Sequence, residues 1–372
     1  MNTFIVSSRE LFTKCEKLAR VINSKNSLPV LDNFLFNVSE GEMRISASDS
    51  EHFATGTLEV TGVDNPFVFG LNARTMVAAL KELAEQPLTV EVDGTTCTIR
   101  YANGHFNLPV ADVTEYPVFP KMKDAAEVTV SFDTLKRILS KCPAFAANDE
   151  LRPVMNSVCF DYADNRLNAV ASDGHALIKL TEACTTHESK GLFMMSIKTA
   201  KLTDSFMDKE GEDVTICHDT RNSYVKIGSY ELTARLIEGK YPNYNAVIPV
   251  NYNDYVEFDR KEMISVARRV GVFANTASQL LKVAVSGMKM NVSGEDIDFS
   301  TKAQATLMVS KSGKDLTIGL KSTIMQTILN AFSCERISLQ YMDASRAVIY
   351  RPADPEEGWS QLILQMPMML NE

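Results

Sequence analysis

The sequence predicts an α+β fold built from one unit that is repeated three times. Three observations support this prediction: an amphipathic helix recurs about every 125 residues, a second helix type recurs between its copies, and alternating strands surround both. The period exceeds the roughly 20–50 residues of solenoid repeats, so each repeat is large enough to form a domain. We therefore expect domains over residues 1–121, 122–252 and 253–372.

The first helix type is marked by an apolar stripe whose positions are separated by four, three and four residues. This spacing places the stripe on one face of a helix. Successive stripes begin 124 and 128 residues apart. They comprise Leu11, Cys15, Leu18 and Ile22, then Leu135, Leu139, Cys142 and Ala146, then Met263, Ala267, Val270 and Ala274.

The second helix type is marked by an apolar pair: Met76 and Leu80, then Leu202 and Phe206, then Met325 and Leu329. One amphipathic helix is common in soluble proteins, but two helix types that recur three times in the same order indicate internal triplication. The six helices are expected over 7–25, 72–86, 133–146, 197–210, 259–275 and 321–332.

Each repeat also contains alternating runs that are typical of strands. In the first repeat these are 4–6, 34–40, 43–49, 67–72 and a hairpin over 88–110 that turns at Asp93–Gly94. Similar runs follow in the other two repeats, and polar segments near 121–126 and 251–254 separate the repeats. Helices on one face of antiparallel strands give an α+β domain.

The chain has a net charge of −9 that is unevenly distributed. The six expected helices carry +8, whereas the remaining residues carry −17. A basic helix layer on an acidic body suggests a polyanionic partner that the net charge conceals. The alternative is that Lys and Arg are simply good helix formers.

Seven scattered cysteines form neither a CxxC motif nor a metal-ligand spacing, which favours reduced thiols in a cytoplasm and predicts no metal. Cys15 and Cys142 lie on apolar stripes, so we expect them in the core. No signal peptide is expected from the first residues, MNTFIVSSRE. The late apolar run Leu362–Leu370 falls far short of the ~20 residues of a membrane span.

Five strings across the chain carry a resemblance to a known family: SLPVLDN (27–33), RPVMNSVCF (152–160), ASDGHALI (171–178), EGKYPNY (238–244) and LQMPMML (364–370). Together with the triplicated α+β units and the basic helices, they resemble the bacterial DNA polymerase III β subunit, the replicative sliding clamp.

The resemblance implies three clamp domains per chain and a head-to-tail homodimer closed into a ring, with helices lining a central hole around double-stranded DNA and antiparallel sheets outside. Such a clamp has no catalytic residues, cofactor or membrane partner. A clamp loader opens it, and it tethers the replicative DNA polymerase, repair polymerases and other clamp-binding-motif proteins. A cytoplasmic, nucleoid-associated location is implied.

Family DNA contacts match basic side chains that should face the hole: Lys25, Arg74, Lys136, Arg152, Lys198 and Lys201. Each could instead be an ordinary solvated charge. Some relatives carry adjacent aromatic residues where this chain has Pro153 and Val154, which puts single-strand contacts there in doubt.

The family's partner-peptide pocket matches Met155, Ser172, Gly174, His175, Leu177, Pro242, Val247, Leu364, Met366, Pro367 and Met368. Flexible methionine thioethers suit a pocket that serves many ligands. The alternative is an edge strand with buried methionines. Positions that are often basic around this pocket are Ala176 and Ala246, and Met369 follows the MPM string. We therefore expect a less basic rim and a weaker preference for acidic peptides.

The family's ring-closing interface matches Phe106 and Leu108 of one protomer, facing Val272 and Phe273 of the other. Apolar anchors of this kind dominate small interfaces. Phe106 could instead be a core residue of its own domain. Few ion pairs are expected, because Asn103 and His105 would face only Asp296 and Asp298.

Two other functional classes stay open. A hydrolase could use Ser172, Asp173 and His175, although three groups within four residues rarely converge as a triad requires. A scaffold could bind peptides without encircling DNA, and only the basic helices argue against it.

Overall fold

The computed structural model describes residues 2–26, 28–118, 122, 124–149, 151–186, 189–208 and 210–370. One element order occurs three times: a strand, a helix, four strands, a second helix and three strands. Two short additional strands, β13 (Thr185–Thr186) and β22 (Ser310–Ser312), interrupt the second and third repeats. The order confirms the triplicated α+β fold.

The bounds of the elements are as follows. The first repeat contains β1 (Asn2–Ser7), α1 (Ser8–Ala19), β2 (Asn33–Ser39), β3 (Glu42–Ser48), β4 (His52–Glu59), β5 (Phe67–Asn72), α2 (Ala73–Lys81), β6 (Pro87–Asp93), β7 (Thr96–Tyr101) and β8 (Gly104–Pro109). The second contains β9 (Ala126–Val130), α3 (Phe132–Lys141), β10 (Ser157–Ala163), β11 (Arg166–Ser172), β12 (Ala176–Ala183), β14 (Lys190–Ser196), α4 (Ile197–Phe206), β15 (Val214–His218), β16 (Asn222–Ile227) and β17 (Tyr230–Arg235). The third contains β18 (Asp254–Asp259), α5 (Arg260–Gly271), β19 (Leu280–Ser286), β20 (Lys289–Asp296), β21 (Thr301–Met308), β23 (Leu316–Lys321), α6 (Ser322–Ala331), β24 (Arg336–Tyr341), β25 (Val348–Pro352) and β26 (Ser360–Gln365).

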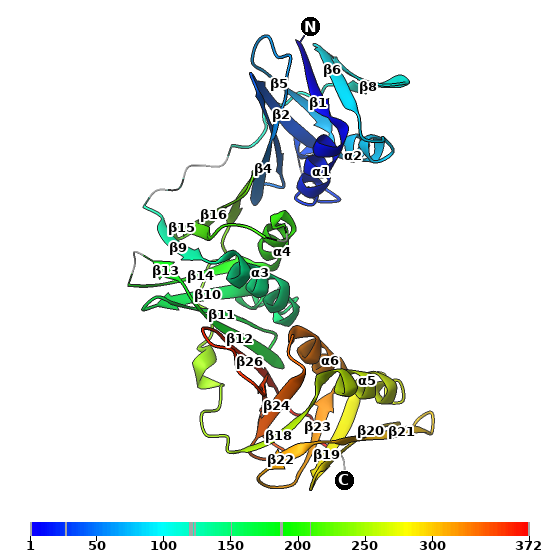
Figure 1. Cartoon of the computed structure of the whole chain (residues 1–372), viewed down its shortest axis with the longest axis vertical. Coiled ribbons are helices and arrows are strands. Elements are labelled where there is room, and N and C mark those ends of the chain that lie inside the picture. The colour runs from blue at the N-terminus through cyan, green and yellow to red at the C-terminus, as the bar shows by residue number, and fades with distance from the viewer. Residues whose placement is uncertain are drawn as a thin grey trace. The chain divides into compact units, whose positions relative to one another are not determined.

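The chain divides into two compact units, whose helices and strands are labelled in Figure 1. Unit 1 comprises residues 1–136, 186–188 and 198–236, and unit 2 comprises 137–185, 189–197 and 237–372. The second repeat contributes to both units. These two units are not the three domains expected from the repeats, so the domain boundaries after residues 121 and 252 stay a prediction.

Each unit holds a nine-stranded and a four-stranded sheet. In unit 1 the strand orders are β13-β9-β15-β16-β17-β4-β3-β2-β5 and β1-β6-β7-β8. In unit 2 they are β14-β10-β11-β12-β26-β25-β24-β18-β22 and β21-β20-β19-β23. Each nine-stranded sheet thus joins strands of two repeats.

The two joining pairs have the same form. In unit 1 the antiparallel pair β17–β4 runs from Tyr230↔Gly56 to Ala234↔His52. In unit 2 the antiparallel pair β12–β26 runs from Ala176↔Gln365 to Thr181↔Ser360. Each joins the last strand of one repeat to the third strand after the first helix of the preceding repeat. β8 is the last strand of the first repeat, and β21 is the third strand after the first helix of the third repeat. Each of these two strands lies at the edge of a four-stranded sheet.

The first helix of a repeat begins at a side-chain cap that its sequence supplies. Ser7 accepts a hydrogen bond from the backbone N–H of Glu10 at α1, and Asp259 accepts one from Glu262 at α5. Such caps satisfy N–H groups that have no partner within the helix.

The predicted helix ends were too late, by up to six residues at α1. In α3 the cause is Pro143, which has no N–H to donate to the Leu139 carbonyl and whose ring would clash with that carbonyl; a 3₁₀ helix over Cys142–Phe145 follows instead. Ile22 and Ala146 consequently lie in turns and are only partly buried.

The other stripe positions form the core, as predicted. Each is at most 5% exposed: Leu11, Cys15, Leu18, Leu135, Leu139, Cys142, Met263, Ala267, Val270 and Ala274. Burial of one leucine stabilises the fold by about 1.5–3 kcal/mol. Burial also raises the pKa of the Cys15 and Cys142 thiols, which keeps them protonated. No helix among the described residues is long and apolar enough to cross a membrane.

Candidate functional site

The candidate peptide site is built on the joining pair β12–β26 of unit 2. Leu177 and Leu364 are directly opposite each other in this pair, so their side chains share one face of the sheet. Both are buried, at 4% and 3% exposure, in one apolar cluster. The cluster also contains Cys159, Val170, Met194, Tyr241, Tyr244, Ala347, Ile349 and Leu362.

The segment after β17 covers this cluster and presents two of the predicted pocket residues. Tyr241 and Tyr244 are buried in the cluster, and the Tyr244 hydroxyl donates to Asp161 Oδ2. Pro242 lies between these tyrosines and is exposed, while Val247 follows them at 57% exposure. Two buried anchors therefore hold the backbone while the flanking apolar side chains remain available to a ligand.

The C-terminal segment after β26 is fixed through its backbone. Met366 N–H donates to the His175 carbonyl at 2.8 Å, and Met368 N–H donates to the Gly319 carbonyl at 2.8 Å. Gly319 permits this close approach, because a Cβ there would lie only 2.5 Å from the Met368 carbonyl oxygen. The Met366 side chain is 42% exposed, and Pro367 and Met368 are half-buried.

The turn between β11 and β12 carries Ser172, Gly174 and His175. Ser172 Oγ donates to the Ala176 carbonyl at 2.8 Å, and Asp173 Oδ1 accepts from the N–H groups of His175 and Ala176 at 2.8 and 2.7 Å. Gly174 has a φ of +92°, which favours glycine. The hydroxyl and the carboxylate thus stabilise the turn, and the carboxylate does not orient the His175 ring as a triad would require.

Arg152 lies beside this turn, and Met155 ends the short 3₁₀ helix Pro153–Met155 that precedes β10. Met155 is 9% exposed, and its N–H donates to the Arg152 carbonyl at 2.9 Å. Arg152 pairs with Asp149 at 2.8 Å, and its Nη1 lies 3.7 Å from where a Cβ on Gly174 would be. Arg152, predicted to contact DNA, therefore lies next to the candidate pocket residue Gly174.

The other predicted DNA-binding side chains fall into two groups. Lys25, Arg74 and Lys201 are exposed and have no ion pair within the part of the chain that the structure describes. Lys136, by contrast, pairs with Asp204 Oδ1 at 3.0 Å. Lys198 Nζ donates to the Val21 carbonyl at 2.8 Å and to Asn23 Oδ1 and Asp49 Oδ2 at 2.6 Å. The first group is available to a partner, whereas Lys198 is committed to the fold.

Asp49 is the buried centre of this Lys198 network, and sequence reasoning missed it. Its carboxylate is 3.1 Å from His52 Nδ1, and His52 Nε2 is 2.9 Å from the Thr199 hydroxyl. Burial alone would raise the pKa of Asp49, but the hydrogen bonds of His52 and Lys198 outweigh it and hold this pKa below its ordinary value. The network ties a loop of the first repeat to α4 of the second.

Two of the predicted ring-closing residues, Phe106 and Leu108, lie on the edge strand β8, and the other two directly follow helix α5. Leu108 on β8 is buried at 8%, and Phe106 is half-buried with its ring centroid 5.0 Å from that of Tyr101. Val272 and Phe273 follow α5 at 79% and 41% exposure. Phe106 is thus only partly covered by its own sheet, and the two residues after α5 expose an apolar surface.

Three family models match successive parts of the chain. They describe the N-terminal domain of the DNA polymerase III beta subunit over residues 2–120, its central domain over 129–243 and its C-terminal domain over 245–367. The chain belongs to the DNA polymerase III beta subunit family. It therefore functions as a sliding clamp, a processivity subunit that is not itself an enzyme.

Relatives and solved structures agree with this assignment along the whole chain. The beta sliding clamps of Haemophilus influenzae and Escherichia coli K12 are 20% and 21% identical, each over 99% of this chain and 100% of the relative. A Pseudomonas aeruginosa sliding clamp bound to griselimycin has a TM-score of 0.94 at 19% identity, covering 99% of this chain and 100% of its own. The Thermotoga maritima beta subunit has a TM-score of 0.90 at 23% identity, with both chains fully covered.

Several residues that support the site were not predicted from the sequence. The tyrosines at 241 and 244 stand within the EGKYPNY string and could have been recognised as anchors. Ile349, on a neighbouring strand, had no such signal, since its place beside Leu364 depends on sheet pairing. No group of three or more His, Cys, Asp or Glu side chains within the described ranges could hold a metal ion.

Proposed function

We propose that this chain closes head to tail with a second copy into a ring around duplex DNA, and that β8 of one copy pairs with β21 of the other. The supporting observation is the repeated junction. The pairs β17–β4 and β12–β26 join strands of the same two kinds as β8 and β21. An unpaired strand edge favours addition of a further strand.

The proposed interface places apolar anchors beside this strand pair. Phe106 and Leu108 of one protomer would contact Val272 and Phe273 of its partner. Buried aromatic and aliphatic anchors of this kind carry most of the binding energy in small interfaces. The charge pairing would be weak, because Asp296 is buried and Lys302 on β21 already pairs with Glu295 at 3.4 Å.

Duplex DNA would contact the basic side chains that the fold leaves available, namely Lys25, Arg74 and Lys201. Contacts of this kind with phosphates are sequence-independent and salt-sensitive, which permits sliding. Lys136 and Lys198 add positive field while holding their own helices in place. Arg152 would contact either DNA or a ligand at the neighbouring pocket.

The peptide site on β12–β26 would receive short apolar peptide motifs from the replicative polymerase, the clamp loader, repair polymerases and other clamp-binding proteins. Leu177 and Leu364 supply its floor, and Pro242, Val247 and Met366 supply exposed apolar walls. Ala246 and Met369 are exposed at the rim, where a base would attract acidic residues. Affinity should therefore depend on apolar side chains more than on acidic ones.

Retention on plasmid DNA tests encirclement. The protein is loaded onto nicked circular plasmid by its cognate clamp loader, and the bound fraction is measured before and after linearisation. A topologically linked ring is retained on the circle in moderate salt and lost from the linear form, because it slides off the ends. Equal retention on both forms would indicate surface binding and would favour the scaffold alternative.

A further inference from the structure

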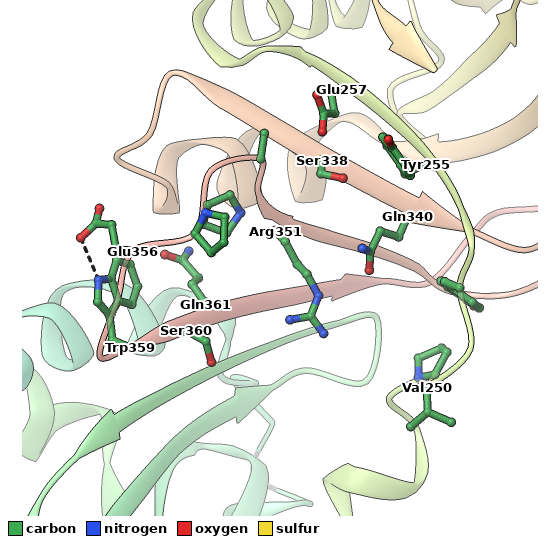
Figure 2. A pocket seen from close by; sticks show the side chains of 15 residues that line it. Val250, Tyr255, Glu257, Ser338, Gln340, Arg351, Glu356, Trp359, Ser360 and Gln361 are labelled. Carbon is green, nitrogen blue, oxygen red and sulfur yellow. Dashed lines mark hydrogen bonds between the residues drawn. The ribbon is translucent and has the colours of Figure 1, made fainter. Parts of the chain in front are cut away.

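A cavity of about 540 Å³ lies on unit 2, outside every site described above. Its walls come from the segment before β18, from strands β18, β24 and β25, from the β25–β26 loop and from the start of β26 (Figure 2). Its size lies within the range of small-molecule sites, which is about 300–1,000 Å³. None of its lining residues is among the predicted DNA-binding, peptide-binding or ring-closing residues.

Arg351 is the central charged group of this cavity. Its guanidinium points into the space between Ser360, Gln340 and Val250 (Figure 2). Arg351 is half-buried and has no carboxylate within ion-pair distance among the residues that the structure describes. Burial lowers the pKa of this guanidinium, which reflects the cost of holding an unpaired charge away from water.

The two acidic residues of the cavity wall are already engaged. Glu257 pairs with Arg336 at 2.6 Å, and Glu356 accepts a hydrogen bond from Trp359 Nε1 at 2.8 Å. Neither neutralises Arg351, although both would repel a multiply charged anion. Arg351 is therefore the uncommitted cation among the described residues that line the cavity.

The remaining wall is aromatic and apolar, with a few neutral hydrogen-bonding groups. Tyr252, Tyr255 and Trp359 supply aromatic surface, and Gln340 and Ser360 supply an amide and a hydroxyl. Tyr255 and Gln340 are opposite each other in the β18–β24 pair, and Ser338 is opposite Arg351 in the β24–β25 pair. The sheet thus fixes Tyr255, Gln340, Ser338 and Arg351 on one floor, while Tyr252 and Trp359 come from the segments that border it.

We propose that this cavity binds a monocarboxylate that carries an aromatic or apolar group, with Arg351 receiving the carboxylate. The planar guanidinium matches a carboxylate through two parallel hydrogen bonds. A phosphate dianion is disfavoured, because Glu257 and Glu356 stand nearby and the lining residues that the structure describes include no second Lys or Arg. The same chemistry is offered by a free small acid and by the C-terminal residue of a protein.

The single tryptophan of the chain, Trp359, lies in the cavity wall and reports directly on binding. Intrinsic fluorescence of the full chain is titrated with 3-phenylpropionate, a free acid, and with N-acetyl-alanyl-phenylalanine, a mimic of a protein C-terminus. The amide of each probe serves as the neutral control. Saturable changes with either acid but not with its amide are expected, and tighter binding of one acid identifies the source.

Arg351→Gln should weaken binding of the acid at least about tenfold, which corresponds to about 1.4 kcal/mol. Arg351→Lys should also weaken it, since an ammonium does not reproduce the two parallel bonds. The matched control is Arg346→Gln, because Arg346 is an exposed arginine that pairs with Asp343 at 3.6 Å. Removal of residues 366–372 should leave binding of the acid unchanged, which separates this cavity from the peptide site.

Native-like thermal unfolding of each variant establishes that its fold is intact. If Arg351→Gln does not fold, the comparison of each acid with its amide in the unaltered chain still decides. Three results would overturn the proposal: equal binding of an acid and its amide, unchanged affinity of the acid for Arg351→Gln, or no saturable fluorescence change up to about 10 mM acid. A Kd of about 10 mM corresponds to a binding free energy of about −2.7 kcal/mol. Loss of encirclement in the plasmid assay would leave this inference unaffected.

Discussion

The proposed peptide site and the proposed ring-closing surface differ in how much of each is completed within one chain. Leu177 and Leu364 are 4% and 3% exposed on a strand pair that the chain forms by itself. Val272 and Phe273 are 79% and 41% exposed, beside a sheet whose edge strand β21 has a neighbouring strand on one side only within the described part of the chain. A ligand of the first surface therefore meets an assembled floor, whereas the second requires another copy to bury its apolar groups.

The largest expected effect follows from Phe273→Arg. A charged side chain at a buried anchor costs the apolar contact and leaves an unpaired charge, so the dimer Kd should rise at least about 30-fold. Native mass at micromolar concentration should fall from dimer to monomer. The matched control is Met342→Arg, since Met342 is also 41% exposed but lies in a loop after β24. A dimeric Phe273→Arg protein would contradict the interface assignment.

Removal of residues 366–372 tests the peptide site. Without Met366, Pro367 and Met368 the apolar wall is lost, so binding of a polymerase or clamp-loader peptide should fall below detection by fluorescence anisotropy. The stability cost should be only about 1–3 kcal/mol, because two backbone hydrogen bonds disappear while β26 keeps both neighbouring strands. Retained peptide binding by a folded truncated chain would refute the assignment.

Two lysines of helix α4 differ in the same way, because Lys198 is bonded within the chain and Lys201 is exposed. Lys198→Met should lower the free energy of unfolding by about 1–3 kcal/mol, because the buried Asp49 and the Val21 carbonyl lose a donor. Lys201→Met, on the same helix α4 but exposed, should change it by less than about 0.5 kcal/mol. Urea unfolding measures both variants. Equal stabilities would mean that the Lys198 network does not stabilise the fold.

Arg74→Gln should have the smallest effect. Arg74 is exposed on α2 without an ion pair within the described part of the chain, so its loss should leave stability unchanged. It should reduce the slope of log affinity for duplex DNA against log salt by about 0.9 for each phosphate contact removed. Arg336→Gln on β24, where Arg336 pairs with Glu257, is the control. An unchanged slope would remove Arg74 from the DNA-facing set.

The triplication could be predicted because buried helix faces impose a period that survives sequence divergence. The strand β4 was not among the runs expected in the first repeat. In β4 the pleat alternation is lost, since five of its eight residues are buried in the middle of a nine-stranded sheet. Gly56, which normally weakens a strand, is needed there, because a Cβ would lie 3.2 Å from the Tyr230 ring.

The run 97–110 shows an error that the sequence could have prevented. It was expected to form one strand but forms β7 and β8, which turn at residues 102–103. Asn103–Gly104 is a strong hairpin signal that the prediction overlooked. The consequence matters for function, because β8 is the strand proposed to meet the second copy.

Among the functional residues, turn contacts could be predicted from local sequence, whereas contacts between distant segments could not. Asp49, Asp173 and Asp296 each accept two backbone N–H groups in a turn after a strand, at intervals of 124 and 123 residues. That repetition is readable from the sequence. The additional bond between Asp49 and Lys198 spans 149 residues and depends on the way the repeats join in unit 1, which local sequence does not encode.

The central claim is that β8 and β21 become a strand pair in the dimer. Hydrogen exchange of their backbone amides, compared between the unaltered protein and Phe273→Arg at equal concentration, tests it most directly. Strand pairing predicts slowed exchange along one alternate set of amides in both strands, and loss of that protection in the variant. Equal exchange in the two proteins, with the unaltered protein dimeric, would show that the copies associate elsewhere and would contradict the account.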